Sequence, residues 1–196
     1  MRVTTTRALA PWLGLAAFAV VFGAQAGPQE DYRLGLKAYQ EEDLITAMRL
    51  LRKSANEGNS SAQVLLAYIL DKAEDNAQAL ALYTAAAEKG DPEGQFGLAE
   101  MYAAGEGTER DNEKAIFWYK RAAEGAQMRA TLVLALAYLE GGLGLQPDRA
   151  VAIEWLKRGA AQGYAPAASI LSRLDGQGVG SAGGDKTQKQ KQQSAQ

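Results

Sequence analysis

The side chains that could support catalysis in this 196-residue chain are almost all carboxylates, because the sequence contains no histidine and no cysteine. The usual general base, thiolate nucleophiles and zinc ligand sets built from these residues are therefore excluded. Two acids can in principle hydrolyse a glycoside, and Glu106 and Glu109 are close in sequence. They stand beside Gly105, Gly107 and Arg110 in a segment that we expect to be a solvated turn. We interpret the two acids as turn residues and predict no catalytic residue.

Four aspartates recur at matching places: Asp43, Asp75, Asp111 and Asp148. Carboxylates in register could suggest a row of cation sites, but these are one repeat apart, whereas the ligands of a calcium ion lie about 2.3 to 2.6 Å from it. An aspartate before a helix accepts a hydrogen bond from a first-turn N–H group and complements the helix dipole. The column therefore predicts helix N-caps, and we predict no metal site and no cofactor.

Two glycine-rich segments, 105–107 and 141–144, resemble phosphate-binding loops in composition. A phosphate-binding loop follows a strand and is followed by a lysine or forms part of a dinucleotide-binding unit, and neither context is present. We expect these glycines to supply positive φ angles where the chain reverses between two helices.

The aspartates are part of an internal repeat that must position any site. A small residue opens an Ala-rich ending eleven residues after each of them. A second column pairs leucine with a small residue: Leu34-Gly35, Leu66-Ala67, Leu98-Ala99, Leu134-Ala135 and Leu171-Ser172. Successive leucines are 32, 32, 36 and 37 residues apart, and most of this variation lies between the leucine and the next aspartate. Two fixed halves joined by a variable turn predict stacked helical units.

The second half of each unit has the spacing of a helix that packs on one face. Alanine follows the aspartate by four residues, at Ala47, Ala79, Ala115 and Ala152, and Leu50, Leu82, Trp118 and Trp155 come three residues later. Spacings of four, three and four place these residues and the small endings together. We expect alanine to let the helices approach closely, and Trp118, Trp155, Tyr102 and Tyr138 to fill the space between them.

The third and fourth units carry a recognisable combination of residues. The third contains Leu98-Ala99, Tyr102, Gly105-Glu106-Gly107, Asp111, Lys114-Ala115, Trp118-Tyr119 and Ala122-Ala123, and the fourth repeats it from Ala130 to Gly163. This pattern resembles the Sel-one-like repeat, a longer-looped relative of the tetratricopeptide repeat. The first two units lack the glycine loop and the tryptophan, and look like degenerate or tetratricopeptide-like units. The resemblance implies an α/α superhelix used as an adaptor or scaffold, without a catalytic centre.

The N-terminus predicts export. Arg2 and Arg7 precede an apolar run from Ala8 to Phe22, and Ala24-Gln25-Ala26 has small residues where signal peptidase requires them. The apolar run is shorter than the roughly 20 residues that span a bilayer. We expect residues 1–26 to be a cleaved signal peptide and the protein to be periplasmic or secreted. An uncleaved segment that tethers the chain to the membrane is the alternative.

Charge and tail composition narrow the partners. The chain has 21 basic and 23 acidic residues, and it lacks the basic stripe that phosphate binding requires, so we predict no nucleic-acid partner. Residues 176–196 are rich in Gly, Ser, Gln and Lys, which predicts a flexible, solubilising tail. Its lysines, Lys186, Lys189 and Lys191, are an alternative contact for an acidic partner or an anionic surface.

One set of positions on the expected first helices is a candidate for binding a protein partner. These positions face away from the leucine column, toward the inner wall of a tetratricopeptide-like superhelix, and most are apolar. The candidates are Tyr32, Leu36, Tyr68, Phe96, Leu132 and Leu136, with Arg33, Lys37 and Arg129 as polar contributors, and the column also contains Val64 and Glu100. Such a wall either packs against the next unit or stays open to bind a segment of another protein.

The sequence therefore predicts an all-α solenoid of about four helix-turn-helix units. The expected units are about 28–58, 61–90, 92–126 and 128–163, within a repeat domain of residues 27–175 that ends in a capping helix over about 165–175. We expect a non-enzymatic exported adaptor that binds another protein. The alternative is a cell-envelope hydrolase or a subunit of an envelope enzyme complex.

Overall fold

The computed structural model describes residues 27–183, and these residues form helices joined by turns, with no strand among them. Eight helices of 13 residues each follow one another in this range: α1 (Pro28–Gln40), α2 (Leu44–Asn56), α3 (Ser60–Lys72), α4 (Asn76–Glu88), α5 (Pro92–Ala104), α6 (Asn112–Glu124), α7 (Met128–Glu140) and α8 (Arg149–Ala161). A 3₁₀ turn, η1 (Gly142–Gly144), follows α7, and α9 (Ala165–Gly183) follows α8. The predicted all-α architecture of paired helices is confirmed.

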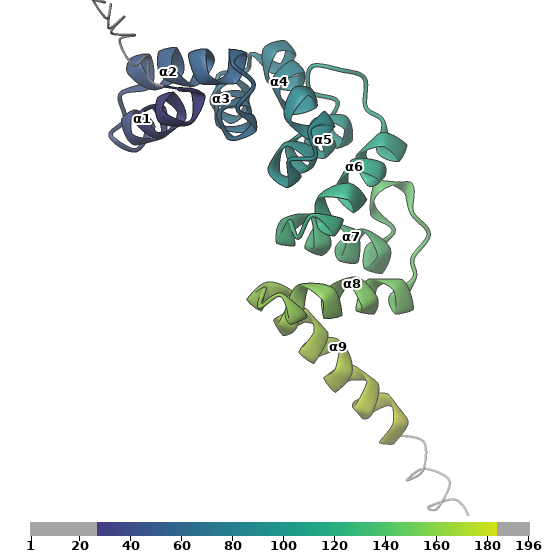
Figure 1. Ribbon diagram of the computed structural model, residues 1–196. Coiled ribbons are helices and arrows are strands. Elements are labelled where there is room, and N and C mark those ends of the chain that lie inside the picture. Colours follow the sequence, from purple (N-terminus) through teal and green to yellow (C-terminus); the bar gives the residue numbers. More distant parts are fainter. Residues whose placement is uncertain (1–26, 184–196) are drawn as a thin grey trace, which may run out of the picture.

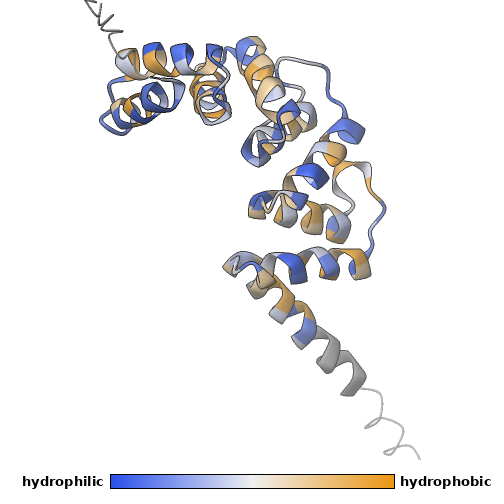
Figure 2. Ribbon diagram, in the orientation of Figure 1, coloured by the Kyte–Doolittle hydropathy of each residue, from blue (hydrophilic) through white to orange (hydrophobic). Residues whose placement is uncertain are grey.

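The helix pairs form a curved solenoid. Each helix packs against its neighbours in sequence, and α3 also contacts α1 and α5. Figure 1 shows the pairs following an arc, with α1, α3 and α5 along its inner side and α2, α4 and α6 along its outer side. Apolar and polar stretches alternate along the helices (Figure 2), as expected when each helix buries only part of its circumference.

The aspartate column caps the second helix of every pair, as predicted. The Asp43 and Asp75 carboxylates accept hydrogen bonds from the backbone N–H groups of Thr46 and Gln78, at 3.1 and 3.3 Å. Asp111 accepts one from Lys114 at 2.9 Å. Asp148 accepts two, from Ala150 and Val151, both at 3.0 Å. Each aspartate satisfies donors that have no partner inside the helix.

The turns between the paired helices differ in length but end at the same place. The backbone N–H of the capping aspartate donates to the carbonyl of one repeat position, namely Ala38, Leu70, Tyr102 and Tyr138 in the four units. The long turns use Gly105, Gly107, Gly141 and Gly144, all with positive φ, as expected from the glycine clusters. The short turns instead place Glu42 and Glu74 at φ of 63° and 62°. The insertion therefore enlarges the turn without shifting either helix.

The connection between units has one position that departs from glycine. Gly58, Gly90 and Gly163 adopt φ of 81° to 90° after the second helix of their units, and Ala126 occupies the corresponding place with φ of 65°. A side chain in this left-handed region is strained.

We expect Ala126→Gly to stabilise the protein by about 0.5 to 1 kcal/mol, because the relief of this strain exceeds the entropy that glycine adds to the unfolded chain. Gly90→Ala is the matched control, since a Cβ at Gly90 would meet no atom within 4 Å and any loss reflects the backbone alone. Urea unfolding midpoints give both values. A less stable Ala126→Gly variant would mean that the alanine methyl group makes a stabilising contact.

The predicted small-residue and leucine columns form the core. Ala47, Ala79, Ala115 and Ala152 are all 0% exposed. On the first helices, Leu66, Leu98 and Leu134 are buried, each followed by a buried alanine. Helix pairs can therefore approach closely along the whole solenoid.

The expectation that the tryptophan column fills the core needs a correction. Trp118, Trp155, Tyr102 and Tyr138 are only half-buried. The large buried side chains lie one residue further along each second helix, at Leu51, Tyr83, Tyr119 and Leu156. Each second helix packs against the first helix of its own unit and also against the helix that follows it in the chain. Its buried face is therefore wide and includes the residue after the tryptophan column.

The last helix is longer than the expected cap. α9 continues to Gly183 instead of ending near 175. Glycine lowers helix propensity but does not block a helical backbone, and no proline follows Pro166 to end the helix. Ala167 is buried against the end of the solenoid, and Ile170, Leu171 and Leu174 pack beside it.

The predicted signal peptide and the tail lysines lie outside the described residues. Within residues 27–183, no helix combines the length and the apolar character needed to cross a bilayer.

Candidate functional site

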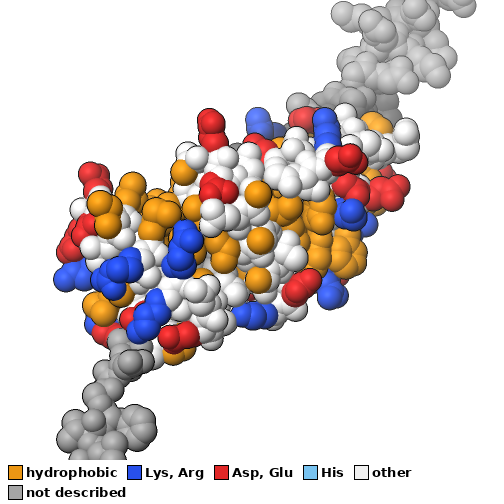
Figure 3. Space-filling view, turned by 90° about the horizontal axis from the view of Figure 1, so that it is seen from above, with side chains coloured by type: hydrophobic (Ala, Val, Ile, Leu, Met, Phe, Trp, Pro, Cys, Tyr) orange, Lys and Arg blue, Asp and Glu red, His pale blue; other side chains and the backbone are white. Residues whose placement is uncertain are grey.

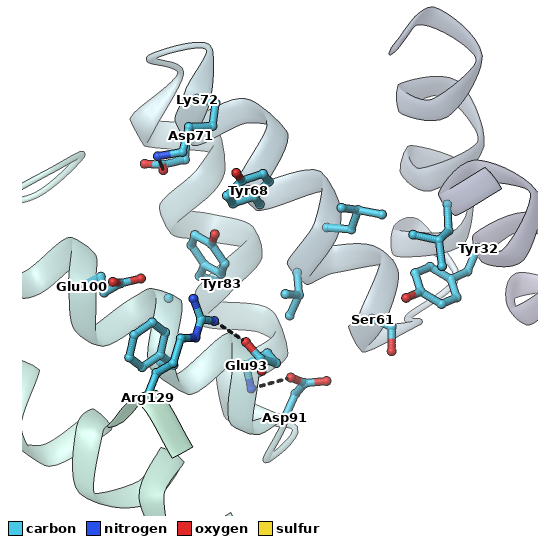
Figure 4. A pocket seen from close by; sticks show the side chains of 15 residues that line it. Tyr32, Ser61, Tyr68, Asp71, Lys72, Tyr83, Asp91, Glu93, Glu100 and Arg129 are labelled. Carbon is cyan, nitrogen blue, oxygen red and sulfur yellow. Dashed lines mark hydrogen bonds and ion pairs between the residues drawn. The ribbon is translucent and has the colours of Figure 1, made fainter. Parts of the chain in front are cut away.

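A cavity of about 420 Å³ opens on the inner side of the arc. Its walls come mainly from α1, α3 and α5. Figure 4 shows Tyr32, Tyr68, Tyr83, Glu100 and Arg129 around it. A second cavity, of about 460 Å³, shares Asp71, Lys72, Tyr83, Gly97 and Glu100 with the first and extends to Glu106 and Tyr119. We call the two adjoining cavities the concave groove.

The groove brings together several of the predicted candidates. Tyr32 and Leu36 from α1, Tyr68 from α3, Phe96 from α5 and Arg129 from α7 all line it. Val64 and Glu100 of the same column also line it. Tyr68 is 43% exposed, whereas Tyr32 and Leu36 are half-buried.

Phe96 belongs to the floor of the groove and not to its open surface. Its residue is only 3% exposed, and its ring meets the Tyr119 ring edge-on with centroids 5.6 Å apart. The Arg129 guanidinium lies over the same ring, 4.3 Å from its centroid. Phe96 therefore supports the groove from below, and an expected anchor is instead a core residue.

Leu132 and Leu136 lie outside the groove. Leu132 packs in the cluster that contains Leu156 and Ala167, and Leu136 lines a separate cavity of about 210 Å³ with Ile170 and Leu174. The cause is α9, which packs against α8 and brings Ala167 into the cluster of Leu132, and Ile170 and Leu174 to the cavity beside Leu136.

Arg33 and Lys37 also do not line the groove. Arg33 binds Glu30 at 2.6 Å and Lys37 lies 3.7 Å from Glu41, both pairs on the exposed side of α1. The groove is lined instead by Asp71, Lys72, Glu93 and Tyr83, which were not among the predicted candidates. The signal that locates Asp71 and Lys72 is their position one turn after Tyr68 on the same inner helix.

Arg129 links two repeats across the groove edge. Its guanidinium donates to the Glu93 carboxylate at 2.7 Å (Figure 4). The Gln127 side-chain amide donates to the other Glu93 oxygen at 2.7 Å. Gln127 is buried, so the Glu93 side chain is held from two directions. This network, together with the stack on Phe96, joins α5 to α7 at the edge of the groove.

A glycine shapes the floor beside Tyr83. A Cβ on Gly97 would lie 2.4 Å from the Tyr83 ring, so only glycine lets that ring lie against α5. The Tyr83 hydroxyl end reaches the groove, and burial raises the pKa of Tyr83. The phenol therefore stays neutral at physiological pH and can act as a donor toward a bound segment.

Among the acids that line this groove, Glu100 has a raised carboxyl pKa. Although much of the residue is exposed, desolvation by the surrounding groove atoms raises the pKa of the Glu100 carboxyl. Asp71 and Glu106 raise this pKa further, and Arg129 and Lys72 oppose the shift. The folded protein thus holds a carboxylate in a place that disfavours its charge.

Glu100→Gln is expected to raise the unfolding temperature at pH 7. The folded-state pKa is above the unfolded value, so the ionised wild-type carboxylate costs stability above the folded pKa, and this cost disappears below the unfolded pKa, about 4.3. The gain should therefore shrink to nothing as the pH falls below about 4. Thermal scans across this range decide it, with Glu88→Gln on the exposed side of α4 as the control. A destabilised Gln variant at pH 7 would mean that Glu100 makes a stabilising native contact.

Aromatic, aliphatic and charged side chains line the groove. Within the part of the chain that the structure describes, no three His, Cys, Asp or Glu residues are arranged to hold a metal ion. Glu106 and Glu109 are both exposed in the turn after α5. In Figure 3 hydrophobic side chains form patches between acidic and basic ones on the face seen from above, without a continuous basic stripe.

Comparison with protein families supports the repeat assignment. The pattern of the Sel1 repeat matches residues 31–59, 60–91, 92–126 and 129–164. These four segments coincide with the four helix pairs, including the two short-turn units.

Two curated proteins with similar sequences are much longer than this chain. Chitin synthase regulatory factor 3 of Schizosaccharomyces pombe is 29% identical over 143 residues, which cover 68% of this chain and 15% of that protein. An uncharacterised protein of Neisseria meningitidis is 35% identical over 129 residues, covering 66% of this chain and 27% of that protein. The chain thus spans about a quarter or less of the length of these two relatives.

Two solved structures share the fold. A Sel1 repeat protein from Oxalobacter formigenes has a TM-score of 0.65 and 32% identity, covering 73% of this chain and 43% of that one. A protective antigen of uropathogenic Escherichia coli has a TM-score of 0.70 and 29% identity, covering 78% of this chain and 34% of that one.

Proposed function

The chain belongs to the Sel1 repeat family, and from this membership we propose that it is a non-enzymatic adaptor that binds a segment of another protein in its concave groove. The observation that carries the proposal is Tyr68, a large aromatic residue 43% exposed in a groove of about 420 Å³. Burying such a side chain against a partner is favourable, and aromatic residues dominate the binding energy of many interfaces.

The rigid surroundings of Tyr68 favour the same function. The floor beneath it is fixed by buried packing, and the Arg129–Glu93–Gln127 network holds the far wall. A wall that is already ordered loses little conformational entropy when a partner binds. The groove is therefore suited to accept an extended or helical segment.

We place this adaptor in the periplasm, or outside the cell, on the basis of residues 1–26. Cleavage after Ala26 should give a mature chain that begins at Gly27, and the intact mass of the exported protein tests this. A mass that retains residues 1–26 would favour the membrane-tethered alternative.

A second candidate is a subunit that regulates an envelope enzyme. Related repeats occur in proteins described as chitin synthase regulators in Schizosaccharomyces pombe and Saccharomyces cerevisiae. In this case the segment that binds in the concave groove would belong to the enzyme. Copurification of an enzymatic activity that depends on Tyr68 would distinguish this role from that of a passive scaffold.

The test of the proposed function is capture from cell-envelope extracts with a matched pair of variants. Tyr68→Ser should weaken partner binding by about 30-fold or more, because interface hot spots contribute about 2 kcal/mol or more. Phe117→Ser removes an aromatic residue of similar exposure, 52%, from the outer helix α6 and should leave capture unchanged. Capture of the same partner by Tyr68→Ser at undiminished affinity would contradict the proposal.

A further inference from the structure

The concave groove changes character from one repeat to the next. The position two residues after the repeat leucine is Leu36 in α1, Tyr68 in α3, Glu100 in α5 and Leu136 in α7. The first three line the groove in this order, and Leu136 lines the separate cavity beside α9. The groove therefore presents an aliphatic side chain, an aromatic one and a carboxylate on three successive inner helices.

The groove contains more acidic than basic side chains, and not all of the acids are paired. Asp71 lies 3.5 Å from Lys72, Glu93 is paired with Arg129, and the Asp91 carboxylate caps α5. Glu100 and Glu106 complete the acidic set, against Lys72 and Arg129 as the two cations that line the groove. Among the residues that the structure describes, neither Glu100 nor Glu106 forms an ion pair. The α5 end of the groove thus carries uncompensated negative charge.

We propose that the partner segment is basic and apolar, with two apolar side chains against Leu36 and Tyr68 and a lysine or arginine paired with Glu100. The proposal rests on the proposed function and specifies the chemistry of its partner. Complementary charge is the argument for this occupant. An acidic segment would place like charges together, and an uncharged one would leave the carboxylate poorly solvated and unpaired.

The surroundings of Glu100 strengthen this assignment. Desolvation raises the pKa of its carboxyl, so a cationic side chain that arrives here relieves an existing cost. Tyr83 and Tyr119 from α4 and α6, both buried, line the same end and limit the access of water to the Glu100 carboxyl. The order of the three repeats also sets where each part of the partner segment binds. The cation contacts α5, and the apolar side chains contact α1 and α3.

A library of random 12-residue peptides displayed on phage can be selected for binding to the protein purified in the form that the cell produces. This selection tests the predicted charge and apolar character of the partner segment without prior choice of a ligand. Peptides retained by the wild type but lost on Tyr68→Ser are the groove-dependent set. We expect this set to be enriched in Lys and Arg beside aromatic or aliphatic residues. Enrichment in Asp and Glu, or no charge preference, would overturn this inference while leaving the groove as a binding site. Absence of any Tyr68-dependent peptide would contradict both the inference and the proposed function.

A titration of the best groove-dependent peptide then assigns the charge to one residue. Glu100→Gln should weaken its binding about fivefold to tenfold and reduce the dependence of affinity on salt, because one charge pair is lost. Glu88→Gln, an exposed acid outside the groove, should change neither. The same peptide with its Lys and Arg replaced by Gln should bind wild type and Glu100→Gln equally. Equal affinity of the basic peptide for wild type and Glu100→Gln would refute the pairing.

Discussion

Alanine substitutions at three consecutive residues of α6 are expected to give three well-separated losses of stability. Phe117→Ala should cost within about 1 kcal/mol, Tyr119→Ala about 3 to 5 kcal/mol, and Trp118→Ala an intermediate amount. The order follows burial. Phe117 is 52% exposed, Trp118 is half-buried, and Tyr119 is 4% exposed.

Tyr119 has the largest expected effect because its ring fills space between two helices that cannot fully close around a cavity. It packs edge-on against Phe96 in a cluster of buried alanines and Leu134, so truncation leaves an unfilled volume beside small side chains. The Phe117 ring centroid lies 5.0 Å from that of Trp118 and 5.6 Å from the Arg121 guanidinium carbon, and the Phe117 residue is 52% exposed.

Chemical denaturation of the three variants gives their free energies of unfolding. Equal m-values are needed for the comparison, since a solenoid can lose cooperativity between repeats. A larger loss of unfolding free energy for Trp118→Ala than for Tyr119→Ala would mean that the tryptophan column forms the core, and would contradict the packing described above.

The second large effect separates the floor of the groove from its surface. Phe96→Ala is expected to cost about 3 to 5 kcal/mol, because the ring is buried and supports both Tyr119 and Arg129. Tyr68→Ser should cost about 1 kcal/mol or less, because its ring is 43% exposed. Only the second variant should stay folded near its wild-type midpoint while losing partner affinity.

A double-mutant cycle between Phe96 and Tyr119 checks the physical reason. Residues in direct contact show a coupling energy of about 0.5 kcal/mol or more, whereas a pair without shared contacts is additive. We expect coupling between Phe96 and Tyr119, and additivity between Phe96 and Phe117. Retention of full stability by Phe96→Ala would mean that the ring is not part of the core.

The regular features of this fold follow from short-range sequence signals. Aspartate caps, alanine columns and turn glycines each act within one helix or one turn, so the repeat register and the helix pairs are predictable. The column of Leu36, Tyr68 and Glu100 is predictable for the same reason, since inner-wall positions recur with the repeat.

The remaining features depend on contacts between distant residues. Phe96 is buried because Tyr119 of α6 and Arg129 of the next repeat both pack on its ring, and no pattern around Phe96 encodes these contacts. Leu136 leaves the inner wall because α9 packs beside it. The large buried side chain is Tyr119 and not Trp118 because each outer helix packs against two neighbours, and the spacing of residues within one helix predicts only a single buried face.

The most direct measurement of the central claim is site-specific photocrosslinking in living cells. A benzoylphenylalanine side chain at position 68 lies in the concave groove, and one at position 45 lies on the outer helix α2, where Ile45 is 85% exposed. We expect position 68 to form an adduct with a distinct protein, to lose it when Glu100→Lys is added, and position 45 to form no adduct with that protein. Crosslinking of the partner at position 45 but not at position 68 would contradict binding in the concave groove.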